Sequence, residues 1–166
     1  MNPLRVLGID PGLNTTGYAV LEGQGRRPRV LEAGVIRPRA KSPLEERLHE
    51  LFQGLQELFS TWPPAAVALE DLFSHYRQPQ AAILMGHARG VICLAAAAAQ
   101  VPVAAYAPAE VKKLVTGHGR AGKEQVQRAV ALQLGLSQVP SPPDVADAMA
   151  VALCHLTHLQ REALAG

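Results

Sequence analysis

Five short runs of apolar and β-branched residues, each bounded by proline, glycine or charged residues, are typical of buried strands. The first three follow one another with short polar connections, which predicts an antiparallel meander. A long helical segment separates the last two, which predicts that these two strands lie parallel. The predicted strands are residues 4–9, 17–21, 30–36, 65–69 and 101–106.

Apolar residues at helical spacing predict five helices around these strands. The first has Ser42 as its cap and Pro43 at its first position, and it ends before Trp62 and two further prolines. Helices interleaved with strands in this way predict an α/β fold, in which helices flank both faces of a mixed five-stranded sheet. The predicted helices are residues 43–61, 78–100, 108–115, 123–134 and 144–164.

The length and composition are those of one globular domain with a substantial core. The chain has 166 residues, of which 48% are apolar. This is enough for a single domain over residues 1–166 and too little for two. Because the formal net charge is only +2, nucleic-acid binding has to come from local clusters of Lys and Arg.

The cysteines and the apolar segments give no indication of secretion or membrane insertion. Cys93 and Cys154 lie in apolar helical segments without paired spacing, which is typical of reduced thiols. The amino terminus has no signal-peptide pattern, and the most hydrophobic window, 91–107, is interrupted by Gln100 and Pro102. We therefore expect a cytoplasmic protein with no membrane partner.

Two of the predicted strands end in a carboxylate. Asp10 follows the first strand and precedes Pro11 and Gly12, which force the chain to turn. Glu70 follows the fourth strand. Aspartate before Pro-Gly is a common turn sequence, so Asp10 taken alone has a structural explanation.

A second pair of acids opens the last helix. Asp144 and Asp147 are three residues apart, which places them on one helix face with roughly 5 to 6 Å between their Cβ atoms. One fits a helix cap, whereas Asp147 lies in an apolar run, where a buried carboxylate needs a partner such as a divalent cation. Four carboxylates from rigid elements suit Mg²⁺ or Mn²⁺, and a clustered acidic site holds two such ions about 3.5 to 4 Å apart. Scattered surface acids are the alternative.

Five motifs, taken together, resemble one known family over nearly the whole chain. In order, they are LGIDPGLNTTGYAV, ALEDLF, GHARGV, EVKKLVTGHGRAGKEQVQ and PPDVADAMAVALCH. This set resembles the RuvC family of Holliday-junction resolvases. The resemblance implies a ribonuclease-H-like fold, a homodimer, and paired symmetric nicks in a four-way DNA junction by metal-dependent hydrolysis that leaves 5′-phosphates. It also implies a short preferred cleavage sequence and a branch-migration motor of the RuvA and RuvB type as partner.

The resemblance also implies roles for individual residues. The functional lysines of the family fall on Lys112 and Lys123, although Lys113 is a neighbour that leaves the first assignment open. The aromatic that stacks on a base or wedges the junction falls on Phe73. The family's four metal-binding acids fall on Asp10, Glu70, Asp144 and Asp147.

Basic residues gather around the glycine-rich loop at residues 116–122. Such a cluster either contacts phosphates beside the acids or forms a solvated helix face, and with the family resemblance we favour DNA contact. Phe73, Tyr76 and Arg77 follow the second acid in a polar segment, and aromatics next to cations suit unpaired bases. The alternative for Phe73 is a cap on the core. The candidate phosphate contacts are Lys112, Lys113, His118, Arg120 and Lys123.

Two further features have both a structural and a functional explanation. His155 lies two helical turns after Asp147 and either reaches the metal site or is a partly buried histidine with a hydrogen bond. A stripe of small residues on the second helix either packs onto the sheet or forms the dimer seam that the resemblance implies. The stripe comprises Gly86, Ala88, Gly90, Ala95 and Ala99.

Two other functions compete with junction cleavage. A relative with the same fold would act on RNA, which nuclease assays on junction, duplex and RNA substrates would separate. A non-catalytic DNA-binding module would bind without a divalent ion and yield no nicked product. An actin-like ATPase needs a second domain of similar size, for which 166 residues are too few.

Overall fold

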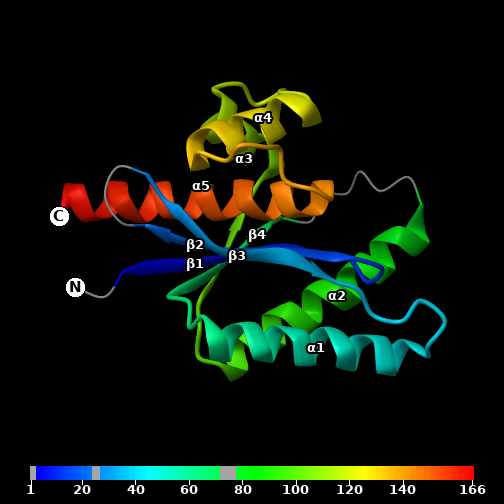
Figure 1. Ribbon diagram of the computed structural model, residues 1–166. Helices are drawn as coiled ribbons and strands as arrows, with labels where there is room; N and C mark the ends of the chain where they lie inside the picture. The colour runs from blue at the N-terminus through cyan, green and yellow to red at the C-terminus, as the bar shows by residue number, and fades with distance from the viewer. Residues whose placement is uncertain (1–2, 24–26, 72–77) are drawn as a thin grey trace.

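A mixed five-stranded sheet forms the centre of the computed structural model, which describes residues 3–23, 27–71 and 78–166 (Figure 1). The strand order is β3-β2-β1-β4-β5. β1, β2 and β3 pair antiparallel, whereas β4 lies parallel to both β1 and β5. The predicted combination of three antiparallel strands and two parallel ones is therefore confirmed. The strands are β1 (Leu4–Asp10), β2 (Thr16–Gly23), β3 (Arg29–Ile36), β4 (Ala66–Glu70) and β5 (Val103–Tyr106).

Helices cover both faces of this sheet. In Figure 1, α1 and α2 lie below the sheet, whereas α5 lies above it with α3 and α4 stacked on its outer side. This matches the predicted arrangement of helices on two faces. The helices are α1 (Leu44–Thr61), α2 (Pro79–Ala98), α3 (Pro108–Thr116), α4 (Lys123–Leu134) and α5 (Pro143–Ala165).

The two helix starts that were predicted from capping residues are shifted. Pro43, with φ −54° and ψ 154°, is the cap of α1, so the prediction of Ser42 as cap is wrong by one residue. Pro142 is the cap of α5, and Asp144 lies within the first turn. In both cases a proline with extended backbone ends the preceding loop and fixes where the helix begins. Capping therefore does not explain the presence of Asp144.

The central strands β1, β2 and β4 are buried on both faces, and their alternate residues belong to two different cores. Val6 belongs to the core beneath α5, whereas Leu7 and Ile9 belong to the core above α1 and α2. In β4, Ala68 faces α5 and Leu69 faces the other helices. Central strands buried on both faces explain the continuous apolar runs of the sequence.

Two glycines allow α5 to lie unusually close to the sheet. A Cβ atom added at Gly8 of β1 would collide with the carbonyl oxygen of Ala148 and lie 2.7 Å from the Cβ of Ala152. One added at Gly17 of β2 would collide with the carbonyl group of Asp144 and lie 2.8 Å from its Cβ. The absence of side chains at these two positions therefore brings the first turns of α5 directly against the ends of β1 and β2.

One helix of the described part of the chain, α2, is long and apolar enough to cross a membrane by length and composition alone. Only 22% of its most hydrophobic window is buried. Its buried residues are Ala88, Ile92, Ala95 and Ala96, which pack against the sheet.

Replacing Gly17 by alanine tests the close approach of α5. The new Cβ has to displace the backbone of Asp144, so we expect the free energy of unfolding to fall by about 1 to 3 kcal/mol, with a fall in Tm of about 2 to 4 °C per kcal/mol. Thermal and urea denaturation measure both quantities. In the control, Gly119→Ala, the new Cβ meets its nearest atom at an ordinary 3.4 Å, and we expect a change below about 0.5 kcal/mol. Equal stability of Gly17→Ala and the native chain would contradict the close approach.

Candidate functional site

Asp10 and Glu70 project from the sheet on the face that α5 covers. Gly8, two residues before Asp10, contacts α5, and Ala68, two residues before Glu70, belongs to the core beneath α5. Side chains alternate between faces along a strand, so both carboxylates follow these neighbours to the same side. Because β1 and β4 are parallel neighbours, their last residues also lie at the same edge of the sheet.

The first turns of α5 add Asp144 and Asp147 to this edge. The pKa of Asp10 is raised to about 8. Burial is the largest cause, followed in order by the charge of Asp147, a side-chain hydrogen bond with Asp144 and the charges of Asp144 and Glu70. Asp10 thus interacts with all three of the other acids. The sequence prediction that these four carboxylates lie near one another agrees with this coupling.

Glu70 and Asp147 lie in a similar environment. Burial raises the pKa of Glu70, as does the charge of Asp147, while Lys112 lowers it. Burial also raises the pKa of Asp147, against the opposing charges of Lys123 and Lys112. Desolvation and like charges therefore disfavour the ionised form of these groups, and the two lysines offset only part of the effect.

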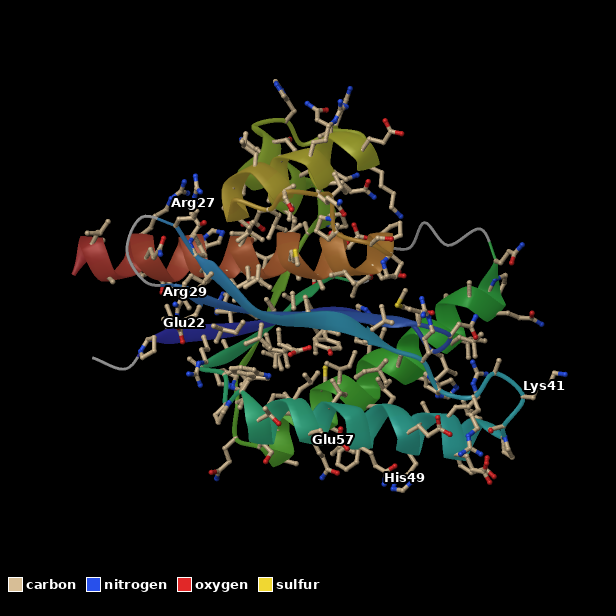
Figure 2. The ribbon with its side chains drawn as sticks, viewed as in Figure 1. Glu22, Arg27, Arg29, Lys41, His49 and Glu57 are labelled. Atoms are coloured by element: carbon tan, nitrogen blue, oxygen red, sulfur yellow. The ribbon has the colours of Figure 1, made fainter. Side chains whose placement is uncertain are left out.

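A buried glutamate elsewhere in the sheet shows what a structural carboxylate looks like in this protein. Glu22 is 3% exposed. It accepts hydrogen bonds from Arg29 Nη2 at 2.8 Å and from Arg5 Nε at 3.1 Å. Glu22 and Arg29 are labelled in Figure 2. These two hydrogen bonds lower its pKa. Asp10 instead has carboxylates as its strongest charged neighbours, which is typical of a functional acidic site rather than of a structural ion pair.

Two cavities divide the four acids between them. The first, about 470 Å³, is lined by Asp10 and Asp144 together with the turn at residues 11–15 and part of α2. The second, about 220 Å³, is lined by Glu70 and Asp147 together with Lys112 and Lys123. Asp10 lines the first cavity with Asp144 but also interacts with Asp147 of the second cavity. It therefore links the acids of the two cavities.

The donor set fits a hard divalent cation, although the cage is not complete in this arrangement. Within the described ranges, no three or more His, Cys, Asp or Glu side chains are already placed around a common ion position. The acids nevertheless offer only oxygen ligands, which is what Mg²⁺ and Mn²⁺ prefer. A bound cation would also remove the repulsion that raises the pKa values of Asp10, Glu70 and Asp147.

The predicted basic residues fall into two groups. Lys112 and Lys123 line the cavity that holds Glu70 and Asp147. Lys113, the neighbour that the sequence left as an alternative to Lys112, is exposed and does not line that cavity. His118 and Arg120 are exposed in the loop between α3 and α4.

Other candidates have a structural explanation or lie outside the described residues. The ring nitrogen Nδ1 of His155 shares a hydrogen bond of 2.6 Å with the hydroxyl group of Tyr106. Burial lowers the pKa of His155, so it is the partly buried, hydrogen-bonded histidine of the two alternatives. Phe73, Tyr76 and Arg77 lie in the segment 72–77, outside the described residues.

Two arginines that the sequence analysis did not select hold the backbone around the acids. Arg47 of α1 donates to Asn14 Oδ1 at 2.7 Å and to the carbonyl oxygen of Leu13 at 3.4 Å, in the turn after Asp10. Arg89 of α2 donates to the carbonyl oxygen of Glu70. Arg89 lies in the motif GHARGV, but neither periodicity nor spacing indicates these contacts, because the partners are mainly backbone groups brought together by the fold.

Comparisons with known proteins agree with this fold. A family model described as crossover junction endodeoxyribonuclease RuvC matches residues 6–155. A protein with this description from Rhodopirellula baltica is 60% identical over 149 residues, which cover 90% of this chain and 84% of the relative.

Solved structures place the chain in the same group. Thermus thermophilus RuvC in complex with a Holliday junction substrate superposes with a TM-score of 0.90 at 37% identity, covering 96% of each chain. The yeast mitochondrial Holliday junction resolvase Ydc2 superposes with a TM-score of 0.68 at 12% identity, covering 96% of this chain and 84% of the other, which shows a shared fold. The fold is the ribonuclease-H-like fold expected from the sequence. With a family model that spans most of its length and a relative at 60% identity, this chain belongs to the RuvC family of crossover junction endodeoxyribonucleases.

Proposed function

We propose that this protein resolves Holliday junctions in DNA recombination and repair, by paired symmetric hydrolysis of phosphodiester bonds that leaves 5′-phosphate ends. The observation that carries the proposal is the meeting of four carboxylates, from two strand ends and one helix, at one edge of the sheet in a member of the RuvC family. The junction-bound relative supports a four-way DNA junction as the substrate.

The four acids would hold Mg²⁺ or Mn²⁺, with two ions in each active site. When bound, such ions offset charge on the scissile phosphate and lower the pKa of water. The division of the acids between two cavities, with Asp10 coupled to both sides, supports two ion positions. Asp10, Glu70, Asp144 and Asp147 would bind and orient the ions.

The basic residues would hold and orient the DNA backbone. Lys112 and Lys123, beside Glu70 and Asp147, lie where a phosphate over the acids would meet positive charge. In our proposal Lys123 takes part in catalysis and the exposed Lys113, His118 and Arg120 contact phosphates farther away. Phe73, Tyr76 and Arg77 would stack on or contact unpaired bases at the junction centre.

A homodimer would explain how one small subunit makes two symmetric nicks. One face of α2 carries Ile83, Gly86, Gly90 and Leu94, of which Ile83 and Leu94 are 60% and 61% exposed. Side chains added at Gly86 or Gly90 would meet no atom of the described residues within 4 Å. The residues of the predicted small-residue stripe therefore lie on two faces of α2. Ala88 and Ala95 are buried against the sheet, whereas Gly86 and Gly90 lie on the face that would pack against a second copy.

This surface also offers an explanation for the apolar character of α2 other than membrane insertion. We therefore propose that the whole chain acts as one nuclease domain in the cytoplasm. A branch-migration motor of the RuvA and RuvB type would be its partner on the junction.

A synthetic mobile four-way junction tests the proposed reaction directly. Each strand is labelled in turn, incubated with the protein and Mg²⁺, Mn²⁺ or a chelator, and the products are mapped and tested for ligation. Symmetric nicks on two opposing strands, sealed by ligase and seen only with metal, are expected. Cleavage of RNA in preference to the junction would favour the RNA-acting alternative, and metal-independent binding without nicks would favour a DNA-binding module.

Changing Asp10 to Asn removes one anionic metal ligand but no phosphate contact. We expect single-turnover cleavage to fall by at least about 1,000-fold, because several kcal/mol of charge stabilisation depend on the metal site, while the Kd for the junction stays unchanged. Glu57→Gln, on the solvent face of α1 (Figure 2), is the control and should cleave normally. Normal cleavage by Asp10→Asn in Mg²⁺ would overturn the assignment of Asp10.

The burial of Asp10 and its repulsion by the other acids predict a pH dependence of stability in the metal-free protein. Asp10 has an ordinary pKa of 3.8 when unfolded and about 8 when folded, so between these values only the folded state holds the proton. Its contribution to stability is complete below the lower value and is lost as the pH rises through the upper one. We expect the Tm of metal-free Asp10→Asn to exceed that of the native chain increasingly toward the upper value, and saturating Mg²⁺ to remove the difference. A constant difference across the range would contradict the coupling.

Changing Leu94 to Glu tests the proposed dimer face. A charge in a packed helix seam is costly to bury, so we expect the variant to run as a monomer in light scattering and to lose paired nicking. The control is Leu132→Glu on α4, where the leucine is 77% exposed and lies away from α2. A dimeric Leu94→Glu variant would exclude this face as the seam.

A further inference from the structure

Arg89 of α2 holds the end of β4 from which the Glu70 side chain projects. Its guanidinium group donates from Nη1 to the carbonyl oxygen of Glu70. Nη2 lies 3.7 Å from Oδ1 of Asp71, the next residue of the chain. The Arg89 side chain is only 18% exposed, although it belongs to a helix on the opposite face of the sheet from the acids (Figure 1).

The register of the sheet explains why the carbonyl group of Glu70 needs this donor. The amide of Asp71 donates to the Tyr106 carbonyl oxygen of β5 at 2.8 Å. In a planar trans peptide the preceding carbonyl group points the other way, toward β1. The last pair between β1 and β4 is Ile9 with Leu69. In a parallel ladder with this register, the backbone nitrogen of β1 that faces the Glu70 carbonyl group is that of Pro11. That nitrogen carries no hydrogen.

The turn that presents Asp10 therefore deprives the neighbouring strand end of its ladder hydrogen bond, and Arg89 replaces it. We propose that Arg89 is a positioning residue that fixes the end of β4, and thereby the Glu70 carboxylate, for metal binding. The proposal rests on the proposed function, in which Glu70 is a metal ligand. Arg89 acts through the backbone and, because its charge faces Asp71 rather than the site, it leaves the acids free for cations.

The experiment compares Arg89→Gln with the native protein in three measurements. These are the affinity of the DNA-free protein for Mn²⁺ by calorimetry, the Mg²⁺ concentration for half-maximal single-turnover cleavage, and the Kd for the junction without metal. Loss of a group that orients a metal ligand costs about 10- to 100-fold in metal affinity or activity. We expect the first two quantities to weaken by this factor, excess metal to restore cleavage, and junction affinity to stay unchanged. Arg161→Gln, an exposed arginine near the end of α5, should match the native protein in all three.

A second substitution separates this role from general packing. Pro11→Ala supplies the missing ladder amide, so the double variant Arg89→Gln/Pro11→Ala should recover part of the Mn²⁺ affinity, whereas a packing defect in α2 would not be rescued. If Arg89→Gln does not fold, Arg89→Lys retains the charge facing Asp71 but not the two-pronged contact, and should weaken Mn²⁺ binding in the same way. Native metal affinity in either folded variant overturns the inference.

The test also distinguishes this inference from the proposed function. If Glu70→Gln cleaves normally, Glu70 is not a metal ligand and the proposed site fails. If Glu70→Gln is inactive while Arg89→Gln binds Mn²⁺ and cleaves like the native protein, the site stands and only the role of Arg89 is wrong.

Discussion

The candidate site depends on how closely α5 packs against β1 and β2. Glycine at positions 8 and 17 removes the Cβ atoms that would otherwise collide with the backbone of α5 at Ala148 and Asp144. The distance between the helix and the sheet is therefore set by backbone contacts, which are far stiffer than contacts between flexible side chains. Because Asp10 ends β1 and Asp144 lies in the first turn of α5, the same contact determines how closely their carboxylates approach. The packing of α5 against the sheet therefore also fixes the geometry of the acidic site.

This arrangement holds carboxylates where they are electrostatically unfavourable. Glu22, which is buried in the sheet, is stabilised by Arg5 and Arg29, and its pKa is lowered. Asp10 has other acids as its strongest charged neighbours, and its pKa rises to about 8. Such a group costs folding free energy that the surrounding core has to offset. The chain thus contains arginines able to neutralise a buried acid and uses them elsewhere, which favours a site kept open for an exchangeable cation.

The sequence predicted the sheet and the clustering of acids because both follow from local rules. Strand ends before Pro-Gly, parallel order inferred from a long intervening helix, and Asp144 and Asp147 on one helix face are all readable from spacing. The helix starts were missed by a residue or two, because a proline rather than Ser42 or Asp144 occupies each cap. The importance of Gly8 and Gly17 was not predictable in this way, since it depends on which helix crosses them. The separation of Lys112 from Lys113 likewise needed the orientation of α3 against α5.

The two faces of the sheet contribute to the site in different ways. The α5 face supplies Asp144 and Asp147 and receives the side chains of Asp10 and Glu70, so every carboxylate lies on that side. The opposite face supplies Arg47 and Arg89, which reach the edge of the sheet and bind mainly backbone carbonyl groups after Asp10 and at Glu70. Both arginines can rigidify the strand ends only because their own charges are directed to Asn14 and Asp71. Had either pointed into the acidic group, it would have lowered the pKa values there as Arg5 and Arg29 lower that of Glu22, and would have competed with the metal. Rigid placement and an unneutralised negative charge are therefore compatible in this fold, because the groups that provide rigidity come from the face that does not carry the acids.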